Sequence, residues 1–253
     1  MKVSVIIPVY NRERLIRPAI LSLLRHRDEA DLDIIVVDDG STDGTSAAVS
    51  GLARAAPNIR MVHQAQSGIA RARNTGLDHI HPEAELVTFL DSDDISVEGR
   101  FAAVLPLFKA DPNLALTYSL VTVTTAIDEL SYLPAPDGRA CTVRGINLGA
   151  ATFRRRAIAA VGRFDEDLKQ SEDLDYLLRF FELSLEYRLV HNISVLYRRH
   201  DENTTRAREE ARRLFCLAVL RSTQRRRRAG NLAPIPKFYD FTELLKPQNA
   251  ALR

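Results

Sequence analysis

The stretch LVTFLDSDDIS, residues 86–96, ends a strand-like apolar run in three carboxylates. Asp91 and Asp93 are two positions apart, so in an extended chain they point to the same side and repel unless a cation or donor groups lie between them. Mg²⁺ and Mn²⁺ suit such a pair, because hard cations take one or two carboxylates and complete their shells with phosphates and water. An Asp-rich turn or a helix cap explains the same residues equally well, so the stretch alone leaves both interpretations open.

The first half of the chain alternates strand-like and helix-like segments. Apolar runs predict strands at residues 3–9, 32–39, 59–63 and 85–90, and helical periodicity predicts helices at 15–24, 45–55 and 68–80. Because the predicted strands are apolar almost throughout, the pattern favours an α/β fold with a Rossmann-like, mostly parallel central sheet and helices on both faces.

A polar cluster follows each of the four predicted strands. The clusters are PVYN, DDGSTDGT, QSGIARARN and DSDD, in chain order. Since the carboxyl ends of parallel strands meet at one edge of a sheet, where ligands bind in such folds, we expect the four clusters to converge there. This convergence is more informative than any single motif.

The second half of the chain is less regular. It predicts helices at residues 100–109 and 171–183, a strand at 114–123, a strand and short helix within 146–168, and closing strands at 186–190 and 193–200. We expect one large domain over residues 1–205 and a basic, helical C-terminal extension over 206–253.

The composition is that of an ordinary globular protein, with 253 residues, 45% hydrophobic and 27% charged. No run approaches the roughly 18 consecutive apolar residues that a membrane span needs. The strand-like start VSVIIPVY leads us to expect no signal peptide. Cys141 and Cys216 are too few for a disulfide framework or a zinc site, and they fit a reducing cytosol.

The charge is unevenly distributed. Residues 206–228 hold nine arginines against two glutamates, whereas the whole chain has a net charge of only +2, so the rest of the chain is acidic. The apolar run LFCLAVL within this basic segment indicates a helix that docks on the body of the protein or on a second copy, as in a homodimer. Peripheral contact with an anionic membrane surface is the other interpretation.

The segment VVDDGSTDGT, residues 36–45, also has two interpretations. Asp43 and Gly44 form a good turn pair, and Ser41 or Thr45 suits a helix cap. A carboxylate at the end of the strand also suits the ring N–H of a pyrimidine. Taken alone, this segment favours the turn.

Two helix starts carry charged residues that suit a ligand. Arg71 and Arg73 begin the third predicted helix, where guanidinium groups and a helix N-terminus both favour a phosphate, although arginines on a solvated helix face are common. A later helix begins with Glu172, Asp173 and Asp175, whose negative charges complement the helix dipole. The functional interpretation makes one of them, preferably Asp173, a general base.

His200 follows the last predicted strand, in YRRHDENTT. It is a candidate metal ligand or phosphate contact, although a lone histidine is more often neither.

Taken in this order, five segments resemble the family 2 glycosyltransferases, which have the GT-A fold and transfer sugars from nucleotide-activated donors with inversion. The segments are VSVIIPVYN (3–11), VVDDGSTDGT (36–45), GIARARNTGL (68–77), FLDSDD (89–94) and EDLDYLLR (172–179). The resemblance covers roughly residues 1–200. It implies a half that binds the nucleotide-sugar, residues 1–95, and a half that binds the acceptor, residues 96–205.

The resemblance also implies roles for single residues. It places one group around the donor: Pro8, Tyr10 and Asn11 by the base, Asp39 on the uracil, Arg71 and Arg73 near the ribose or diphosphate, and Asp91 with Ser92 near the ribose or the metal shell. It makes Asp93 the main carboxylate ligand of Mn²⁺ or Mg²⁺, with His200 as a further ligand, and Asp173 the catalytic base.

The chain also departs from some relatives. Many have Trp after the ED pair, where this chain has Leu174, and the sequence contains no Trp. The QxxRW motif and membrane helices of processive polysaccharide synthases are absent from it. The resemblance therefore implies transfer of a single sugar, in surface polysaccharide or glycoconjugate biosynthesis.

The partners implied are a nucleotide-sugar donor, in particular a UDP-sugar, and a saccharide or lipid-linked acceptor, with no nucleic acid. A cytoplasmic location, including the inner face of the membrane, fits these partners.

Two other functions stay open at this stage. A nucleotidyltransferase typically has a Gly-rich basic loop after its first strand, which PVYNRERL lacks. A nucleic-acid-binding protein would use the arginine-rich extension, but the body is acidic and no basic-aromatic interleaving is present.

Overall fold

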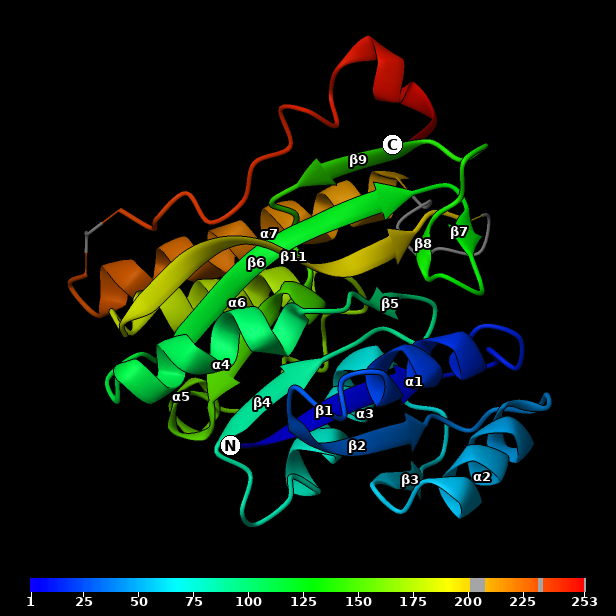
Figure 1. Ribbon diagram of the computed structural model, residues 1–253. Helices are drawn as coiled ribbons and strands as arrows, with labels where there is room; N and C mark the ends of the chain where they lie inside the picture. The colour runs from blue at the N-terminus through cyan, green and yellow to red at the C-terminus, as the bar shows by residue number, and fades with distance from the viewer. Residues whose placement is uncertain (201–207, 232–233, 253) are drawn as a thin grey trace.

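Strand β1 (Lys2–Val9) lies at the centre of the first half of the molecule, and all its residues after Lys2 are buried. Its Val and Ile side chains fill both faces of the sheet, which explains its nearly continuous apolar sequence. Strands β2 (Asp31–Asp38) and β4 (Leu86–Phe89) flank it in parallel, and β3 (Ile59–His63) pairs with β2. This computed structural model describes residues 1–200, 208–231 and 234–252 (Figure 1).

The described strands form one nine-stranded mixed sheet and a small two-stranded one. The main path is β3-β2-β1-β4-β10-β6-β11-β5, with β9 on β6. The remaining strands are β5 (Ile95–Ser96), β6 (Leu116–Thr124), β7 (Ile127–Asp128), β8 (Leu133–Pro134), β9 (Ala140–Val143), β10 (Ala151–Arg154) and β11 (Tyr187–Arg198). The first four strands are parallel as predicted, whereas β10 runs antiparallel between β4 and β6.

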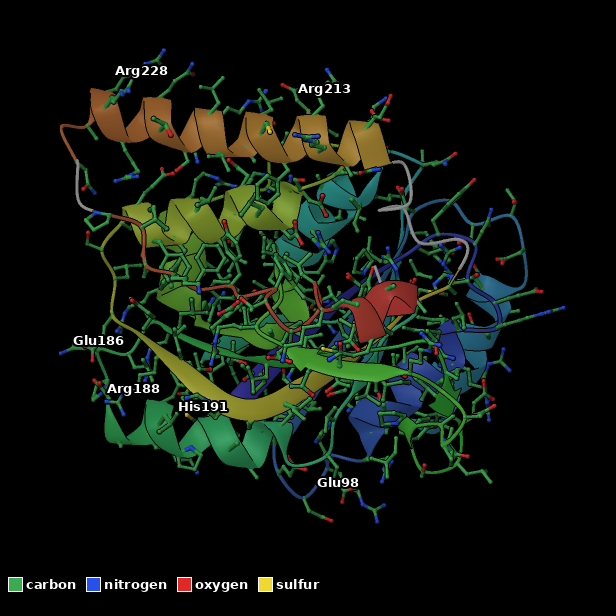
Figure 2. The ribbon with its side chains drawn as sticks, turned by 90° about the horizontal axis from the view of Figure 1, so that it is seen from above. Glu98, Glu186, Arg188, His191, Arg213 and Arg228 are labelled. Atoms are coloured by element: carbon green, nitrogen blue, oxygen red, sulfur yellow. The ribbon has the colours of Figure 1, made fainter. Side chains whose placement is uncertain are left out.

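Helices cover both faces of the sheet, which confirms the predicted α/β architecture. They are α1 (Ile16–Leu24), α2 (Thr45–Ala55), α3 (Ile69–Asp78), α4 (Arg100–Ala110), α5 (Arg155–Val161), α6 (Glu172–Glu182) and α7 (Arg208–Arg228), with 3₁₀ turns η1 (Leu148–Ala150) and η3 (Pro247–Leu252). Seen from above, α4 lies on one side of the sheet, and α6 and then α7 form layers on the other (Figure 2).

The register places the predicted polar clusters at one edge. Val9 of β1 pairs with Asp38 of β2, and Ile6 pairs with Phe89 of β4. The residues that follow these strands, among them Tyr10 and Asp91, therefore leave the sheet at the same edge. The predicted convergence rests on this parallel pairing.

One long strand replaces the two closing strands predicted at 186–190 and 193–200. β11 runs parallel to β6 over most of its length, with irregular register between Leu189 and Val195. A bulge of this kind breaks the side-chain alternation, which is why the sequence pattern reads as two pieces.

The basic helix α7 packs against α6. Leu214, Ala218 and Ser222 are buried. Arg225 donates to Glu182 at 2.8 Å and to Asp175 at 3.0 Å. The docked-helix interpretation of the extension thus agrees with the structure, and Arg213 and Arg228 lie on the outer side of α7 (Figure 2).

Residues 234–252 also return to the body, where Phe238 is buried and stacks on Phe181 with ring centroids 4.6 Å apart. The expected domain boundary between residues 205 and 206 lies outside the described residues. Within the described part of the chain, no helix is both long and apolar enough to cross a bilayer. The membrane contact and the homodimer stay predictions.

Gly76 offers a test of how closely α3 packs on β1. A Cβ at this position would overlap the side chain of Ile6, whereas a Cβ at Gly51 of α2 meets no atom within 4 Å. We expect Gly76→Ala to lower the free energy of unfolding by about 1–3 kcal/mol through overpacking. Gly51→Ala should raise it by about 0.5–1 kcal/mol, because Ala is the better helix former. Urea denaturation checks both, and a stabilised Gly76→Ala protein would contradict the packing.

Candidate active site

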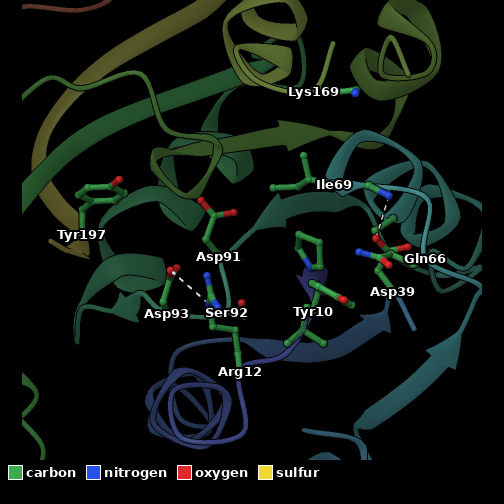
Figure 3. Close-up of a pocket in the computed structure, with 14 residues that line it drawn as sticks. Tyr10, Arg12, Asp39, Gln66, Ile69, Asp91, Ser92, Asp93, Lys169 and Tyr197 are labelled. Carbon is green, nitrogen blue, oxygen red and sulfur yellow. Dashed lines mark hydrogen bonds and ion pairs between the residues drawn. The ribbon is translucent and has the colours of Figure 1, made fainter. Parts of the chain in front are cut away.

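A cavity of about 360 Å³ opens at the sheet edge where the polar clusters meet (Figure 3). We call it the main cavity. It is lined by Pro8, Val9, Tyr10, Arg12, Asp39, Gln66, Gly68, Ile69, Ala72, Asp91, Ser92, Asp93, Lys169 and Tyr197. Figure 3 shows Asp39 and Gln66 at one end, Asp91, Asp93 and Tyr197 at the other, and Tyr10 between them. Six of the eleven predicted site residues thus line this cavity.

The carboxylate of Asp39 holds the loop that leads into α3. It accepts hydrogen bonds from Gln64 Nε2 at 2.7 Å and from the backbone N–H groups of Ser67 and Gly68, both at 2.8 Å. A carboxylate offers about four acceptor positions, so one remains for a ligand N–H. Asp39 therefore shapes this end of the cavity and still has a position open toward it.

Asn11 forms hydrogen bonds that hold the backbone of the loops at this edge of the sheet. It has a left-handed φ of 48°, and its side-chain oxygen accepts from the N–H of Thr42 at 2.8 Å. Its own N–H donates to Ser41 Oγ at 3.0 Å. Asn11 therefore ties the loop after β1 to the loop after β2, and it lines a neighbouring cavity instead of the main one.

The three carboxylates after β4 have three different environments. Asp91 lines the main cavity and accepts from Arg73 at 2.9 Å. Asp93 Oδ2 lies 2.9 Å from His200 Nε2 and 3.9 Å from Arg12 Nε. Asp91 and Asp93 thus each have a partner of their own.

Asp94 is fully buried and accepts from Asn147 Nδ2 at 3.3 Å and from the N–H of Arg198 at 3.1 Å. Burial, together with the charges of Asp93 and Asp91, raises the pKa of Asp94 well above its usual value. Asp94 connects the loop before η1 to the end of β11, so its role is structural.

Asp93 and His200 fit a divalent cation by the chemistry of their donor atoms. A carboxylate oxygen and an imidazole nitrogen are both ligands that Mn²⁺ takes, and such ions complete their shells with phosphates and water. Among the described residues no group of three or more His, Cys, Asp or Glu side chains forms a ready metal cluster. The pair therefore suits a cation that substrate phosphates help to hold.

Arg73 is buried and joins two elements that are far apart in the sequence. Its guanidinium donates to Asp91 after β4 and also to Glu172 at the start of α6. It lies over the ring of Phe164 at 5.7 Å. Arg73 thus fixes α6 against the carboxylates of the cavity, and it does not itself line the cavity.

Asp173 occupies the first turn of α6, directly after Glu172. Burial and the charge of Glu172 raise the pKa of Asp173 to about 7, against the opposing effect of Arg73. A carboxylate with such a pKa is suited to accept a proton near neutral pH. Asp173 lies outside the lining of the main cavity, and the Glu172–Arg73–Asp91 contacts connect its helix to it.

Arg71 lies on the exposed side of α3. It pairs with Glu166 at 3.3 Å and does not line the main cavity. Its position in this structure agrees with the interpretation of Arg71 as an arginine on a solvated helix face.

Sequence reasoning missed four lining residues with polar side chains: Arg12, Gln66, Lys169 and Tyr197. Arg12 directly follows PVYN, and Gln66 is the first residue of QSGIARARN. Their positions at these two polar clusters could have indicated that they belong to the site. Lys169 lies three residues before the acidic start of α6, and Tyr197 lies within YRRHDENTT, but neither position by itself shows that the side chain reaches this cavity. Only the folded chain brings them to this cavity.

Residues 4–160 match the family model described as glycosyl transferase family 2, more than half of the chain. The chain belongs to this family. Its relatives include the minor teichoic acid biosynthesis protein GgaA of Bacillus subtilis, 26% identical over 211 residues, which cover 79% of this chain and 47% of GgaA. This family 2 chain thus spans about half the length of that curated relative.

Solved structures share the fold of this family 2 chain. TarS 1–349 of S. aureus in complex with UDP-GlcNAc matches with a TM-score of 0.64 and 19% identity, over 87% of this chain and 66% of that one. The mannosyltransferase PcManGT of Pyrobaculum calidifontis, in complex with GDP-Man and Mn²⁺, matches with a TM-score of 0.67 and 18% identity, over 98% and 68%. Both confirm the GT-A architecture.

The Arg73 bridge predicts a large difference between two arginines of α3. Arg73→Met leaves the buried carboxylate of Glu172 without its partner, so we expect a loss of about 3–5 kcal/mol in the free energy of unfolding. Arg71→Met, on the exposed side, should change it by less than about 0.5 kcal/mol. Chemical denaturation of both variants measures this difference, and equal losses would contradict a bridging role for Arg73.

Proposed function

We propose that this protein is an inverting glycosyltransferase that moves one sugar from a UDP-sugar to an acceptor hydroxyl, in the synthesis of a surface polysaccharide or glycoconjugate. The observation that carries the proposal is the Arg73 bridge. It joins Asp91, on the wall of the main cavity, to Glu172, the neighbour of Asp173. The donor cavity and the proposed base thereby belong to one connected network.

The arrangement of the main cavity supports binding of a nucleotide along its length. Asp39 lies at one end, which we assign to the base, and Tyr10 lies between that end and the carboxylates. Pro8 lines the same cavity, and the remaining acceptor position of Asp39 is proposed to take the uracil N–H. Asp91 and Ser92 follow toward the ribose, and Asp93 lies at the end assigned to the diphosphate.

The cation is proposed as Mn²⁺ or Mg²⁺, held by Asp93 and His200. When bound, it supplies Lewis-acid stabilisation of the charge on the leaving nucleoside diphosphate. Arg12, 3.9 Å from Asp93, adds positive charge around the same space, and Lys169 lines the cavity on the side opposite Arg12 in Figure 3. Arg12 therefore favours the negatively charged leaving group.

Asp173 is proposed to accept the proton of the acceptor hydroxyl as that oxygen attacks the anomeric carbon. Attack from the face opposite the leaving group inverts that carbon without a covalent intermediate. A positioned base contributes about 10²–10⁴-fold to such a reaction. The half formed by residues 96–205 is proposed to bind the acceptor, because it supplies α6.

The relatives support the donor and pathway parts of the proposal. TarS is known with UDP-GlcNAc, PcManGT with GDP-Man and Mn²⁺, and GgaA acts in teichoic acid biosynthesis by its name. The family match favours this activity over the nucleotidyltransferase and the nucleic-acid-binding protein that the sequence left open. UDP is preferred over GDP because uracil presents a single N–H to an acceptor, whereas guanine presents its ring N–H together with an amino group and would need a second acceptor position.

Calorimetry with UDP tests the proposed donor site. We expect UDP to bind in the presence of Mn²⁺ and much more weakly without it. Asp93→Asn should remove most of the Mn²⁺ dependence, since the amide is a far weaker cation ligand than the carboxylate. Asp137→Asn, at an exposed position away from the cavity, is the matched control. Absence of UDP binding with and without Mn²⁺ would contradict the assignment.

The raised pKa of Asp173 predicts a pH dependence. Only the ionised carboxylate accepts a proton, so kcat/KM should increase about tenfold per pH unit below about 7 and level off above it. Asp173→Asn should lose about 10²–10⁴-fold in turnover, yet bind UDP as the unchanged protein does. UDP release from a panel of UDP-sugars measures turnover. Full activity in Asp173→Asn would exclude this residue as the base.

A further inference from the structure

A second cavity, of about 540 Å³, lies next to the main cavity and is lined mostly by charged side chains. We call it the basic cavity. Its residues come from the loop before α1, the turn before α2, the end of β6 and the end of β11: Asn11, Arg12, Glu13, Arg14, Leu15, Asp43, Thr125, Arg198, Arg199 and His200. Four of the ten are arginines.

The two acidic residues of the basic cavity are engaged by backbone donors. Glu13 Oε2 accepts from the N–H of Gly44 at 3.0 Å. Asp43 accepts from the N–H of Thr45 at 3.0 Å and from the N–H of Glu13 at 3.2 Å. These hydrogen bonds connect the loop before α1 to the turn before α2, so both carboxylates stabilise the loops. Among the residues that line the basic cavity, the arginines therefore outnumber the carboxylates four to two.

The basic cavity is continuous in its lining with the main cavity. Arg12 lines both. His200, on the basic side, lies 2.9 Å from Asp93, on the main side. A group bound among the arginines is thus separated from the proposed cation and diphosphate by little more than this pair of side chains.

We propose that the basic cavity binds a phosphate group of the acceptor. Planar guanidinium groups match phosphate oxygens in pairs, and several arginines around one cavity favour a group with two negative charges. The donor's diphosphate is assigned to the end of the main cavity at Asp93, so we assign an anion among Arg14, Arg198 and Arg199 of the basic cavity to the second substrate. The inference rests on the proposed function and narrows its acceptor to a phosphate-bearing molecule.

The probe is sn-glycerol 3-phosphate, titrated by calorimetry into the full chain saturated with UDP and Mn²⁺. We expect it to bind, and glycerol not to bind. Arg14→Gln should weaken the binding on the order of tenfold, because a charge-assisted contact is lost. Arg14 is exposed, so its replacement leaves the core unchanged.

Arg17→Gln is the matched control. Arg17 is an exposed arginine of α1 outside the lining of the basic cavity, and its replacement changes the net charge by the same amount. It should bind the probe as the unchanged protein does, and both variants should bind UDP normally. Equal weakening in the two variants, or displacement of the probe by UDP, would overturn the proposal.

A vesicle-binding experiment distinguishes a lipid phosphate from the phosphate of a soluble acceptor. If the acceptor is a lipid phosphate, vesicles containing phosphatidic acid should pellet the unchanged protein and Arg17→Gln but not Arg14→Gln. A soluble acceptor predicts Arg14-dependent binding of the probe alone. Titration of the probe without UDP measures binding to the basic cavity even if UDP does not bind. Failure of the donor assignment would abolish UDP binding, whereas failure of this inference would abolish probe binding.

Discussion

The buried guanidinium of Arg73 is the contact on which the arrangement of the site depends. It lies between a carboxylate that follows β4 and a carboxylate that begins α6, which are separated by about a third of the chain. A buried ion pair is strongly oriented, because a partner displaced from it would remain charged in a poorly solvating interior. Sheet edge and helix are therefore held in one relative position, and Asp173 is held with the helix.

The carboxylates of LVTFLDSDDIS show how a fold accommodates concentrated negative charge. Asp91 has a buried arginine, Asp93 an imidazole with an arginine nearby, and Asp94 an amide and a backbone N–H. The turn and cation interpretations of this stretch consequently apply to different residues. Asp94 is structural, whereas Asp93 has the chemistry of a cation ligand.

The sequence was a reliable guide where periodicity and chain proximity determine the structure. The predicted helix over residues 45–55 matches α2, and the strand over 59–63 matches β3. Six predicted site residues share the main cavity because parallel strands end at one edge. Arg73 differs, since no local pattern shows that a helix-start arginine turns inward to Glu172. Lys169 and Tyr197 were missed for a related reason: only folding brings them to a cavity whose other polar residues are distant in sequence.

The ion pairs between α7 and α6 bear on how the arginine-rich segment can vary during evolution. Asp175 is almost fully buried and binds both Arg179 and Arg225, while Glu182 holds the same Arg225. A change at Arg225 that is neutral for an unattached tail would remove this partner from Glu182 and leave Asp175 with Arg179, both on the helix that carries Asp173. Position 225 should therefore covary with positions 175 and 182 among homologues, whereas Arg227 and Arg228, which are exposed, should drift freely.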